Sequence, residues 1–383
     1  MPDRQFPDLN TFNLAPNAPI CLREVRKTRF YSGFTVNTIE KRGCDLLKTL
    51  IIRLLGLGDV ANILIPAARM IRAKDPSSTV DVLTYGAGVE LADLCPEISD
   101  VLAVDKEQWP DDPLKAVASF SSLAFFLTQR EYDEIYCIDT WFMPCFLATY
   151  LREIGLNVQG NFISKDTLEI TQSIIAGNAD PSYFQGTNYL KSTFSNMESW
   201  KGKWWDIYPE YENYAHFFLL HCCSLQGKYD MNLDVEVDKN LSEIALDKKI
   251  IAVSHAGSGK NKVYTNYVEL INTLEKSGVH VWSRFDGSQP ILKTLQMLRS
   301  TDLVVTVATS TQWLAQAVGT PSLVIPGCLP PSVLGAELCV ESHVKCQYCV
   351  KEPCLENQDY ECMKIDPALL VDSCLEYLET KTD

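Results

Sequence analysis

The sequence has no apolar run of the roughly 18–20 residues that a helix needs to span a bilayer. Its start, Met1-Pro-Asp-Arg-Gln-Phe, lacks the basic and then apolar layout of a secretion signal. It also lacks a basic excess, because 34 Lys and Arg stand against 49 Asp and Glu, a net charge of −15. General binding to a nucleic-acid backbone needs a basic face. We therefore expect a cytoplasmic globular protein with no membrane span and no general nucleic-acid binding.

The length of 383 residues exceeds what one ordinary core accommodates, and two alternating series of strands and helices divide it. Short apolar runs predict strands, and runs with helical periodicity predict helices. The expected strands are 47–55, 79–84, 100–104 and 134–138, then 249–254, 279–282, 303–307 and 322–325. The expected helices are 60–73, 88–94, 113–129 and 142–154, then 264–277, 289–299, 311–318 and 367–378.

Strands separated by helices of this length predict parallel sheets with helices on both faces. We therefore expect an α/β protein with two doubly wound halves joined near residues 225–245. The aromatic- and Asn-rich stretch 160–215 is expected to form long loops with helical pieces. Residues 1–48 are expected to form a short N-terminal extension with a small hairpin over 22–37.

Ligands bind such sheets at the carboxyl ends of the strands, and Gly56-Leu-Gly-Asp59 follows the first expected strand. The two glycines let the backbone come close to a ligand, and the next helix begins with free N–H groups. The Asp59 carboxylate at this place can take a proton from an attacking hydroxyl. Capping of the helix by Asp59 stays open as an alternative, because a lone G-x-G is a weak signal. Asp139, at the end of another strand, is a candidate for contact with the molecule that carries this hydroxyl, which we call the acceptor.

Two further turns follow strands of the second series. The turn 308–311 (Ala-Thr-Ser-Thr) precedes a helix, so its N–H and hydroxyl groups can hold a phosphate at the positive end of the helix dipole. Ordinary capping is the alternative. The turn 255–262 (HAGSGKNK) combines Gly and Ser with Lys260 and Lys262 and is a candidate diphosphate clamp, although its spacing is not that of a P-loop. Lysines that are merely solvated are the alternative there.

In their order along the chain, these three turns resemble the heptosyltransferase family of glycosyltransferases (family 9). The segment 50–60 (LIIRLLGLGDV), followed by Pro66-Ala-Ala-Arg, looks like that family's opening strand, GD turn and helix. The segments 298–306 and 314–327 are similar to its nucleotide-sugar segment. The resemblance covers about residues 49–375.

The resemblance implies the GT-B fold, in which two Rossmann-like domains face each other across a cleft. Residues 49–235 correspond to the acceptor-side domain, and residues 236–383 correspond to the nucleotide-sugar-binding domain. By the same resemblance, Asp59 is the general base, and Lys262 rather than Lys260 contacts phosphate. The other implied donor-binding positions are Gly58, Thr309, Ser310 and Thr311.

Departures from the family pattern concern the donor site. The usual Asp-Thr-Gly is Ala308-Thr309-Ser310 here, so a carboxylate expected to touch the sugar is missing. The usual His shortly after it is Trp313, and the usual Lys-x-Trp-Pro is Lys262-Val-Tyr-Thr. The Trp before Leu-Ala, followed by a cysteine cluster, looks more like the autotransporter heptosyltransferases than the lipopolysaccharide enzymes. These departures bear on the donor sugar and the acceptor more than on the class of reaction.

Four of the 14 cysteines crowd into 17 residues as C-x2-C-x4-C-x7-C. These are Cys346, Cys349, Cys354 and Cys362. Four thiolates can complete a closed, structural site for zinc or iron. The autotransporter branch that the chain resembles carries an iron-binding cysteine finger in the corresponding place. A disulfide or free thiols are the alternatives.

The sequence therefore predicts an inverting glycosyltransferase that uses a nucleotide-sugar, best matched by ADP-heptose, and an acceptor protein or glycan with a free hydroxyl. One alternative is a nucleotide-sugar epimerase of the same fold, for which Asp59 alone supplies too few acid–base groups. Another is a non-catalytic assembly or binding protein whose metal finger drives oligomerisation. Assembly into a homo-oligomer is a further expectation.

Overall fold

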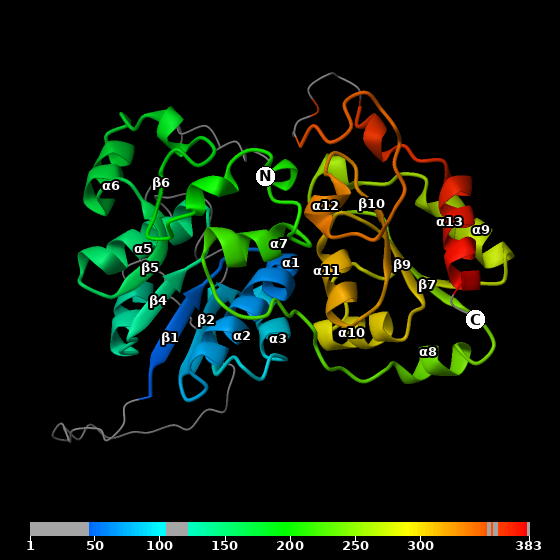
Figure 1. Ribbon diagram of the computed structural model, residues 1–383, viewed down its shortest axis with the longest axis horizontal. Helices are drawn as coiled ribbons and strands as arrows, with labels where there is room; N and C mark the ends of the chain where they lie inside the picture. The colour runs from blue at the N-terminus through cyan, green and yellow to red at the C-terminus, as the bar shows by residue number, and fades with distance from the viewer. Residues whose placement is uncertain (1–45, 105–121, 351–353, 355–358, 381–383) are drawn as a thin grey trace.

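The computed structural model describes residues 46–104, 122–350, 354 and 359–380, which form two β-sheets flanked by helices. Figure 1 shows the sheets side by side, the first in the half coloured blue to green and the second in the half coloured yellow to red. The strands are β1 (Lys48–Ile52), β2 (Thr79–Tyr85), β3 (Asp100–Val104), β4 (Glu134–Cys137), β5 (Val158–Ile163), β6 (Leu190–Ser192), β7 (Ile250–Ser254), β8 (His280–Trp282), β9 (Leu303–Val307), β10 (Ser322–Ile325) and β11 (Leu338–Cys339).

The first sheet has the strand order β3-β2-β1-β4-β5-β6. Its neighbouring strands run parallel except β5 and β6, which are antiparallel. The chain builds outward from β1 to β3 on one side and from β4 onward on the other. The loops after β1 and β4 therefore leave the sheet at its topological switch point, where ligands bind open α/β sheets.

The second sheet has the order β11-β10-β9-β7-β8, and all its neighbouring strands are parallel. Here the order reverses between β7 and β9. The loops after these two strands therefore occupy the corresponding place in the second half.

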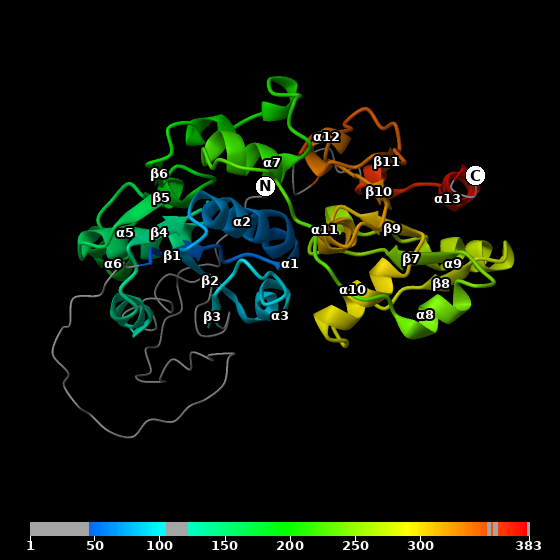
Figure 2. The ribbon, with the colours of Figure 1, turned by 60° about the horizontal axis from the view of Figure 1, so that its bottom comes forward.

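Helices lie on both faces of each sheet (Figures 1 and 2). They are α1 (Leu57–Asp59), α2 (Ile65–Lys74), α3 (Val89–Ala92), α5 (Phe142–Glu153), α6 (Thr167–Ile175), α7 (Tyr214–Phe217), α8 (Lys239–Ile244), α9 (Tyr267–Lys276), α10 (Ile291–Arg299), α11 (Ser310–Ala317), α12 (Pro331–Leu334) and α13 (Pro367–Thr380). Residues 122–129 are also helical. Short 3-10 turns lie at Gly86–Gly88, Pro181–Phe184, Met197–Trp200, Trp204–Asp206, Lys260–Lys262 and Glu361–Met363.

The helix expected over 60–73 is present but divided. Its first part, Val60–Leu64, is a π-helical turn whose five residues are all buried, and α2 follows with Pro66 in its first turn. Proline has no N–H to give to the preceding turn, which is compatible with the wider π-helical turn just before it. A second π-helical turn lies at Phe218–Cys222. Such turns are frequent at functional sites.

The largest apolar core runs from one half into the other. It joins Val60 and its neighbours in the first half to Trp313 and Leu314 of α11 in the second, and α11 packs against both α1 and the Val60–Leu64 turn. A second core lies under α9 and α13, which Figure 1 shows side by side. Because the halves share apolar contacts at α1 and α11, we call this place the seam.

The sequence expectation for 160–215 was wrong in part. Strands β5 and β6 lie in or next to this stretch, in which no strand was expected, whereas helix α6 agrees with the expected helical pieces. The strand β5 contains Gln159, Gly160 and Asn161, and this polar run conceals the apolar pattern that marks a buried strand. Helix α8 lies in the expected linker. The hairpin expected over 22–37 lies outside the described residues, as does part of the helix expected over 113–129.

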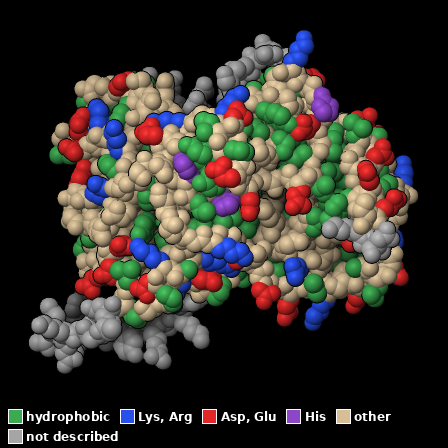
Figure 3. Space-filling view, in the orientation of Figure 1, with side chains coloured by type: hydrophobic (Ala, Val, Ile, Leu, Met, Phe, Trp, Pro, Cys, Tyr) green, Lys and Arg blue, Asp and Glu red, His purple; other side chains and the backbone are tan. Residues whose placement is uncertain are grey.

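Within the described ranges, no helix combines the length and the apolar character that crossing a bilayer requires. Figure 3 shows one face of the molecule, on which acidic and basic side chains are interspersed. On that face the excess of acidic residues does not gather into one large patch of a single sign.

Candidate active site

The candidate site residues lie at the two topological switch points. Asp59 follows β1 and Asp139 follows β4, two strands that pair directly in parallel register. In the second half, the turn that contains Lys262 follows β7, and Thr309 follows β9. Ligand-binding loops of doubly wound sheets occupy these positions.

The first candidate turn is Gly56–Asp59 at the end of β1. The N–H of Asp59 donates to the carbonyl oxygen of Gly56 at 2.9 Å, which closes the turn. The Asp59 side chain makes no capping hydrogen bond to the π-helical turn that follows. Its Oδ1 instead accepts a hydrogen bond from Nη2 of Arg53 at 2.7 Å, and the side chain is 21% exposed. Capping therefore does not explain Asp59, which is ion-paired and reaches the surface.

Arg53 is a buried charge that sequence reasoning missed. Its side chain is 1% exposed, and its Nη1 donates to the carbonyl oxygen of Ile138 at 2.8 Å. The same Nη1 lies 3.9 Å from Oδ1 of the fully buried Asp139. Burial by itself lowers the pKa of Arg53, but the Asp59 and Asp139 carboxylates outweigh it and raise that pKa above its ordinary value. The sequence signal was a charge within the apolar run 50–55.

Asp139, a candidate for contact with the acceptor, lies beneath the surface. Its side chain is fully buried, and its carboxylate accepts hydrogen bonds from the N–H groups of Leu54 at 2.7 Å and Trp141 at 3.1 Å. Burial raises the pKa of Asp139 above its ordinary value, although the positive charge of Arg53 acts in the opposite direction. Asp139 therefore joins the ends of β1 and β4 beneath the surface.

Tyr214 lies at the seam and was also missed. Its hydroxyl oxygen accepts a hydrogen bond from Nδ2 of Asn62 at 2.8 Å, and its ring packs edge-on against Trp313 with centroids 5.4 Å apart. Burial, and then the negative charge of Asp59, raise the pKa of Tyr214, so that the phenol stays neutral. Nothing in the sequence around Tyr214 indicated this place, because its partners come from distant parts of the chain.

The second candidate turn forms the N-terminus of α11. Thr309 is extended, and its side chain makes no capping hydrogen bond, so the hydroxyl does not satisfy the first N–H groups of the helix. Ser310 is half-buried. The hydroxyl of Thr311 is buried and shares a hydrogen bond with that of Ser254 at 2.9 Å. Thr309 and Ser310 are therefore placed to offer side-chain groups to an anion, whereas Thr311 has only its N–H to offer.

The third candidate turn, at 255–262, folds back against the second. The N–H of Gly257 donates to the carbonyl oxygen of Lys262 at 2.7 Å. A Cβ placed on Gly257 would lie 3.0 Å from Cβ of Lys262 and 3.1 Å from Oγ1 of Thr309. Lys262 is half-buried whereas Lys260 is exposed. The half-buried lysine is thus the one beside the α11 N-terminus.

Gly58 brings the two halves together. A Cβ placed on it would lie 3.0 Å from Cδ1 of Trp313 and 3.3 Å from Cα of Ser310. The absence of a side chain at Gly58 lets the turn that carries Asp59 come up to the first turn of α11. All three candidate turns therefore meet around one helix end.

The four predicted metal ligands are only partly assembled. The N–H of Cys349 donates to the carbonyl oxygen of Cys346 at 3.1 Å in a tight turn, Cys354 is half-buried, and Cys362 is buried. Burial, and then the nearby thiols of Cys328 and Cys349, raise the pKa of Cys362 to about 12. Among the side chains that the structure describes, no three His, Cys, Asp or Glu groups are arranged to hold a metal ion. The closed metal site on these four cysteines therefore stays a prediction.

The segment that contains Cys328 and the predicted metal ligands packs against the turn 255–262, which carries Lys262. Nδ2 of Asn261 donates to Sγ of Cys328 at 3.6 Å, and Nε2 of Gln347 donates to the carbonyl oxygen of Gly327 at 3.0 Å. The turns Lys260–Lys262 and Glu361–Met363 also contact each other. The segment therefore supports the loop that carries Lys262.

Comparison with known proteins identifies the fold. Neither a protein-family model nor a curated protein sequence matches the chain, but solved structures do. A family 9 glycosyl transferase from Veillonella parvula superposes with a TM-score of 0.59 at 12% identity, over 89% of this chain and 100% of that one. The ADP-heptose lipopolysaccharide heptosyltransferase II of Escherichia coli gives 0.55 at 14% identity, over 88% and 100%.

A third similar structure is TibC from enterotoxigenic Escherichia coli, an iron-containing dodecameric heptosyltransferase solved with ADP-D-β-D-heptose. It gives a TM-score of 0.52 at 13% identity, over 88% of this chain and 79% of that one. At such identities the likeness establishes the fold. The two parallel-dominated sheets with their flanking helices are the GT-B fold of these glycosyltransferases.

Proposed function

We propose that the protein is a glycosyltransferase that moves a sugar from a nucleotide-sugar to an acceptor hydroxyl, with inversion at the anomeric carbon. The observation that carries this proposal is the contact between the Gly58 turn and the first turn of α11. It brings a surface-reaching carboxylate, Asp59, close to a helix N-terminus and a lysine from the other half. The fold shared with heptosyltransferases supports the proposal.

In this mechanism Asp59 acts on the acceptor. Its carboxylate takes the proton of the acceptor hydroxyl as that oxygen attacks the anomeric carbon from the side opposite the nucleotide. The bond between the anomeric carbon and the phosphate oxygen breaks, and the nucleoside diphosphate leaves with the electron pair. Because the attack comes from the opposite side, the configuration at the anomeric carbon inverts.

The second half stabilises the leaving group. Negative charge grows on the diphosphate as the bond breaks, and fixed donors aimed at that charge lower the barrier. We assign this role to Lys262 and to the first N–H groups of α11, assisted by the hydroxyls of Thr309 and Ser310. A helix N-terminus and an ammonium group are both suited to a diphosphate.

We propose ADP-heptose as the donor and a hydroxyl of a protein or glycan as the acceptor. Two of the similar proteins are heptosyltransferases described with ADP-heptose. A nucleotide-sugar donor agrees with the expected cytoplasmic location.

Turnover of a donor panel tests the proposal. The protein is incubated with ADP-heptose and with UDP-, GDP- and dTDP-sugars, with and without a mixture of hydroxyl acceptors, and the released nucleoside diphosphate is measured. We expect release from one donor class, stimulated by acceptor and lost in Asp59→Asn. No release and no binding of any donor would favour the assembly-protein alternative.

The sequence prediction of a structural iron or zinc ion on Cys346, Cys349, Cys354 and Cys362 has its own test. Elemental analysis of the purified protein should find one metal ion per chain that the double variant C346S/C349S loses. We also propose a homo-oligomer, in line with the dodecameric TibC, and light scattering of the same two samples tests it. A metal-free monomer would contradict both.

A further inference from the structure

The buried guanidinium of Arg53 lies beneath Asp59, the proposed base. Arg53 is 1% exposed, and its guanidinium lies over the ring of Phe218 with Cζ 5.5 Å from the centroid. Taking such a group out of water is costly unless its donors are paired. Yet Nε of Arg53 has no hydrogen-bond partner among the described residues. An incompletely satisfied buried charge calls for an explanation other than packing.

The contacts of Arg53 are directed at Asp59. Nη2 lies 2.7 Å from Oδ1 of Asp59, whereas Nη1 lies 3.9 Å from Oδ1 of Asp139. Asp139 already accepts two backbone N–H groups, from Leu54 and Trp141. If Arg53 served only to neutralise Asp139, the shorter contact would be the one with Asp139.

The other terminal nitrogen of the Arg53 guanidinium, Nη1, is held by the backbone at the end of the sheet. Nη1 donates to the carbonyl oxygen of Ile138 at 2.8 Å, just past the end of β4. One end of the guanidinium is therefore fixed to the sheet and the other to the carboxylate. With Oδ1 of Asp59 held in this way, Oδ2 is the oxygen left to take a proton. Of Arg53 and Asp59, only Asp59 reaches the surface, with 21% of its side chain exposed.

We propose that Arg53 is a positioning residue for the reaction: it fixes one oxygen of the Asp59 carboxylate and so turns the other toward the acceptor. This inference rests on the proposed function. The planar guanidinium binds Ile138 and Asp59 at once, which a single ammonium group cannot do with the same geometry.

The test compares the kcat of transfer by Arg53→Met with its donor KM. Removing the charge should lower kcat about tenfold or more at neutral pH, a loss within the usual contribution of a positioned base. Donor KM should stay within about twofold, since the donor is held by the other half.

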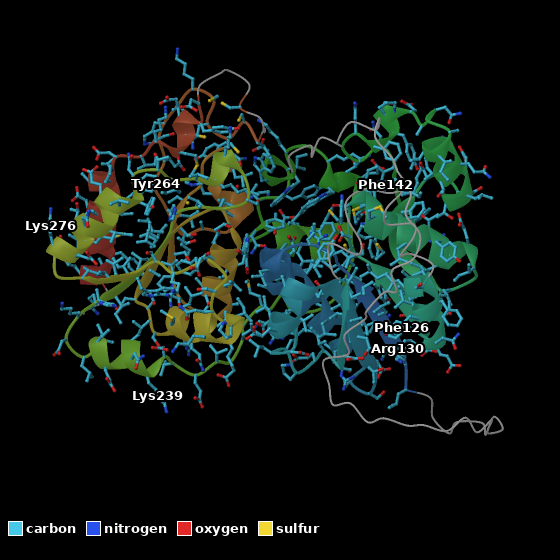
Figure 4. All side chains as sticks on the ribbon, turned by 180° about the vertical axis from the view of Figure 1, so that it is seen from behind. Phe126, Arg130, Phe142, Lys239, Tyr264 and Lys276 are labelled. Atoms are coloured by element: carbon cyan, nitrogen blue, oxygen red, sulfur yellow. The ribbon has the colours of Figure 1, made fainter. Side chains whose placement is uncertain are left out.

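Arg130→Met is the matched control. Arg130 pairs with Asp100 through Nη1 and Oδ2 at 2.9 Å in the same half and packs over Phe126, away from the seam (Figure 4). Loss of this pair should leave kcat and donor KM unchanged. An Arg53→Met protein that is folded and keeps the wild-type kcat would overturn the proposal.

If Arg53→Met does not fold, Arg53→Lys decides. It keeps the charge but loses one of the two anchors, so kcat should fall about tenfold with an unchanged donor KM. Unchanged kcat in folded Arg53→Lys would then contradict a positioning role. Failure of the proposed function looks different, because then the wild-type protein itself releases no nucleoside diphosphate.

Discussion

The two halves of the molecule bring different chemistry to the same seam. The first half supplies three charged side chains: Arg53 and Asp139 are buried, and Asp59 reaches the surface. Arg53 and Asp59 form an ion pair at 2.7 Å. The second half supplies a helix N-terminus, small hydroxyl residues and Lys262, with no carboxylate in the turn 308–311. A proton acceptor must be held in one protonation state, whereas a diphosphate needs only fixed donors. The difference suggests that one half activates the acceptor and the other holds the donor.

Asp59→Asn should have the largest effect. Asparagine keeps the size of the side chain but cannot take a proton, so kcat should fall about 100- to 10,000-fold. Donor binding should be retained. Steady-state assay of nucleoside diphosphate release measures the first quantity and titration with donor the second.

The control for Asp59→Asn is Asp75→Asn, which changes a half-buried turn carboxylate that binds Ser77. It should leave kcat unchanged. An Asp59→Asn enzyme with near wild-type kcat would assign the base elsewhere.

Lys262→Ala should have the next largest effect, and on the other side of the comparison. Loss of one charge-assisted contact to the diphosphate should weaken donor binding about tenfold to a hundredfold. Lys260→Ala removes the exposed lysine of the same turn and should change affinity little. Equal losses in the two variants would show that the turn acts through general charge rather than through Lys262.

Gly58→Ala tests whether the two halves must touch. The new Cβ would lie 3.0 Å from Cδ1 of the buried Trp313, so α11 or the turn must shift. Overpacking of this kind costs about 1–3 kcal/mol, and we expect a lower Tm together with a severalfold loss of kcat. Gly56→Ala is the matched control, because no atom lies within 4 Å of a Cβ placed there. Similar effects from both substitutions would contradict a special role for the contact at Gly58.

Glu90→Gln should have the smallest effect. The Glu90 carboxylate of α3 accepts the N–H groups of Ile291 at 3.0 Å and Leu292 at 3.2 Å, and so caps α10 in the other half. Loss of its charge should cost about 1 kcal/mol or less. Thermal unfolding of Glu90→Gln measures this cost, with Glu275→Gln at an exposed position as the control. Identical Tm values for the two variants would show that this cross-half cap contributes nothing.

The sequence predicted the alternating elements well where each strand is a compact apolar run. The strands 100–104, 303–307 and 322–325 match β3, β9 and β10. It failed at β5, where Gly160 and Asn161 interrupt the run, and that strand pairs with a polar edge strand, β6. Periodicity reports burial of a face, and a strand of mixed character shows little of it.

The candidate site was predictable as far as its turns and not as far as its contacts. Asp59, Lys262 and Thr309 could be chosen because each follows a strand. The pairing of Asp59 with Arg53 depends on how the chain turns after β1. The approach of Gly58 to Ser310 depends on how the two halves pack against each other. No local pattern contains that information.

The most direct test of this division of labour is calorimetric titration of ADP-heptose into the Asp59→Asn and Lys262→Ala variants side by side. The account predicts that Asp59→Asn binds the donor like the wild type while having lost transfer, and that Lys262→Ala binds it at least about tenfold more weakly. If Asp59→Asn loses donor binding while Lys262→Ala keeps it, the assignment of acceptor and donor to the two halves is contradicted.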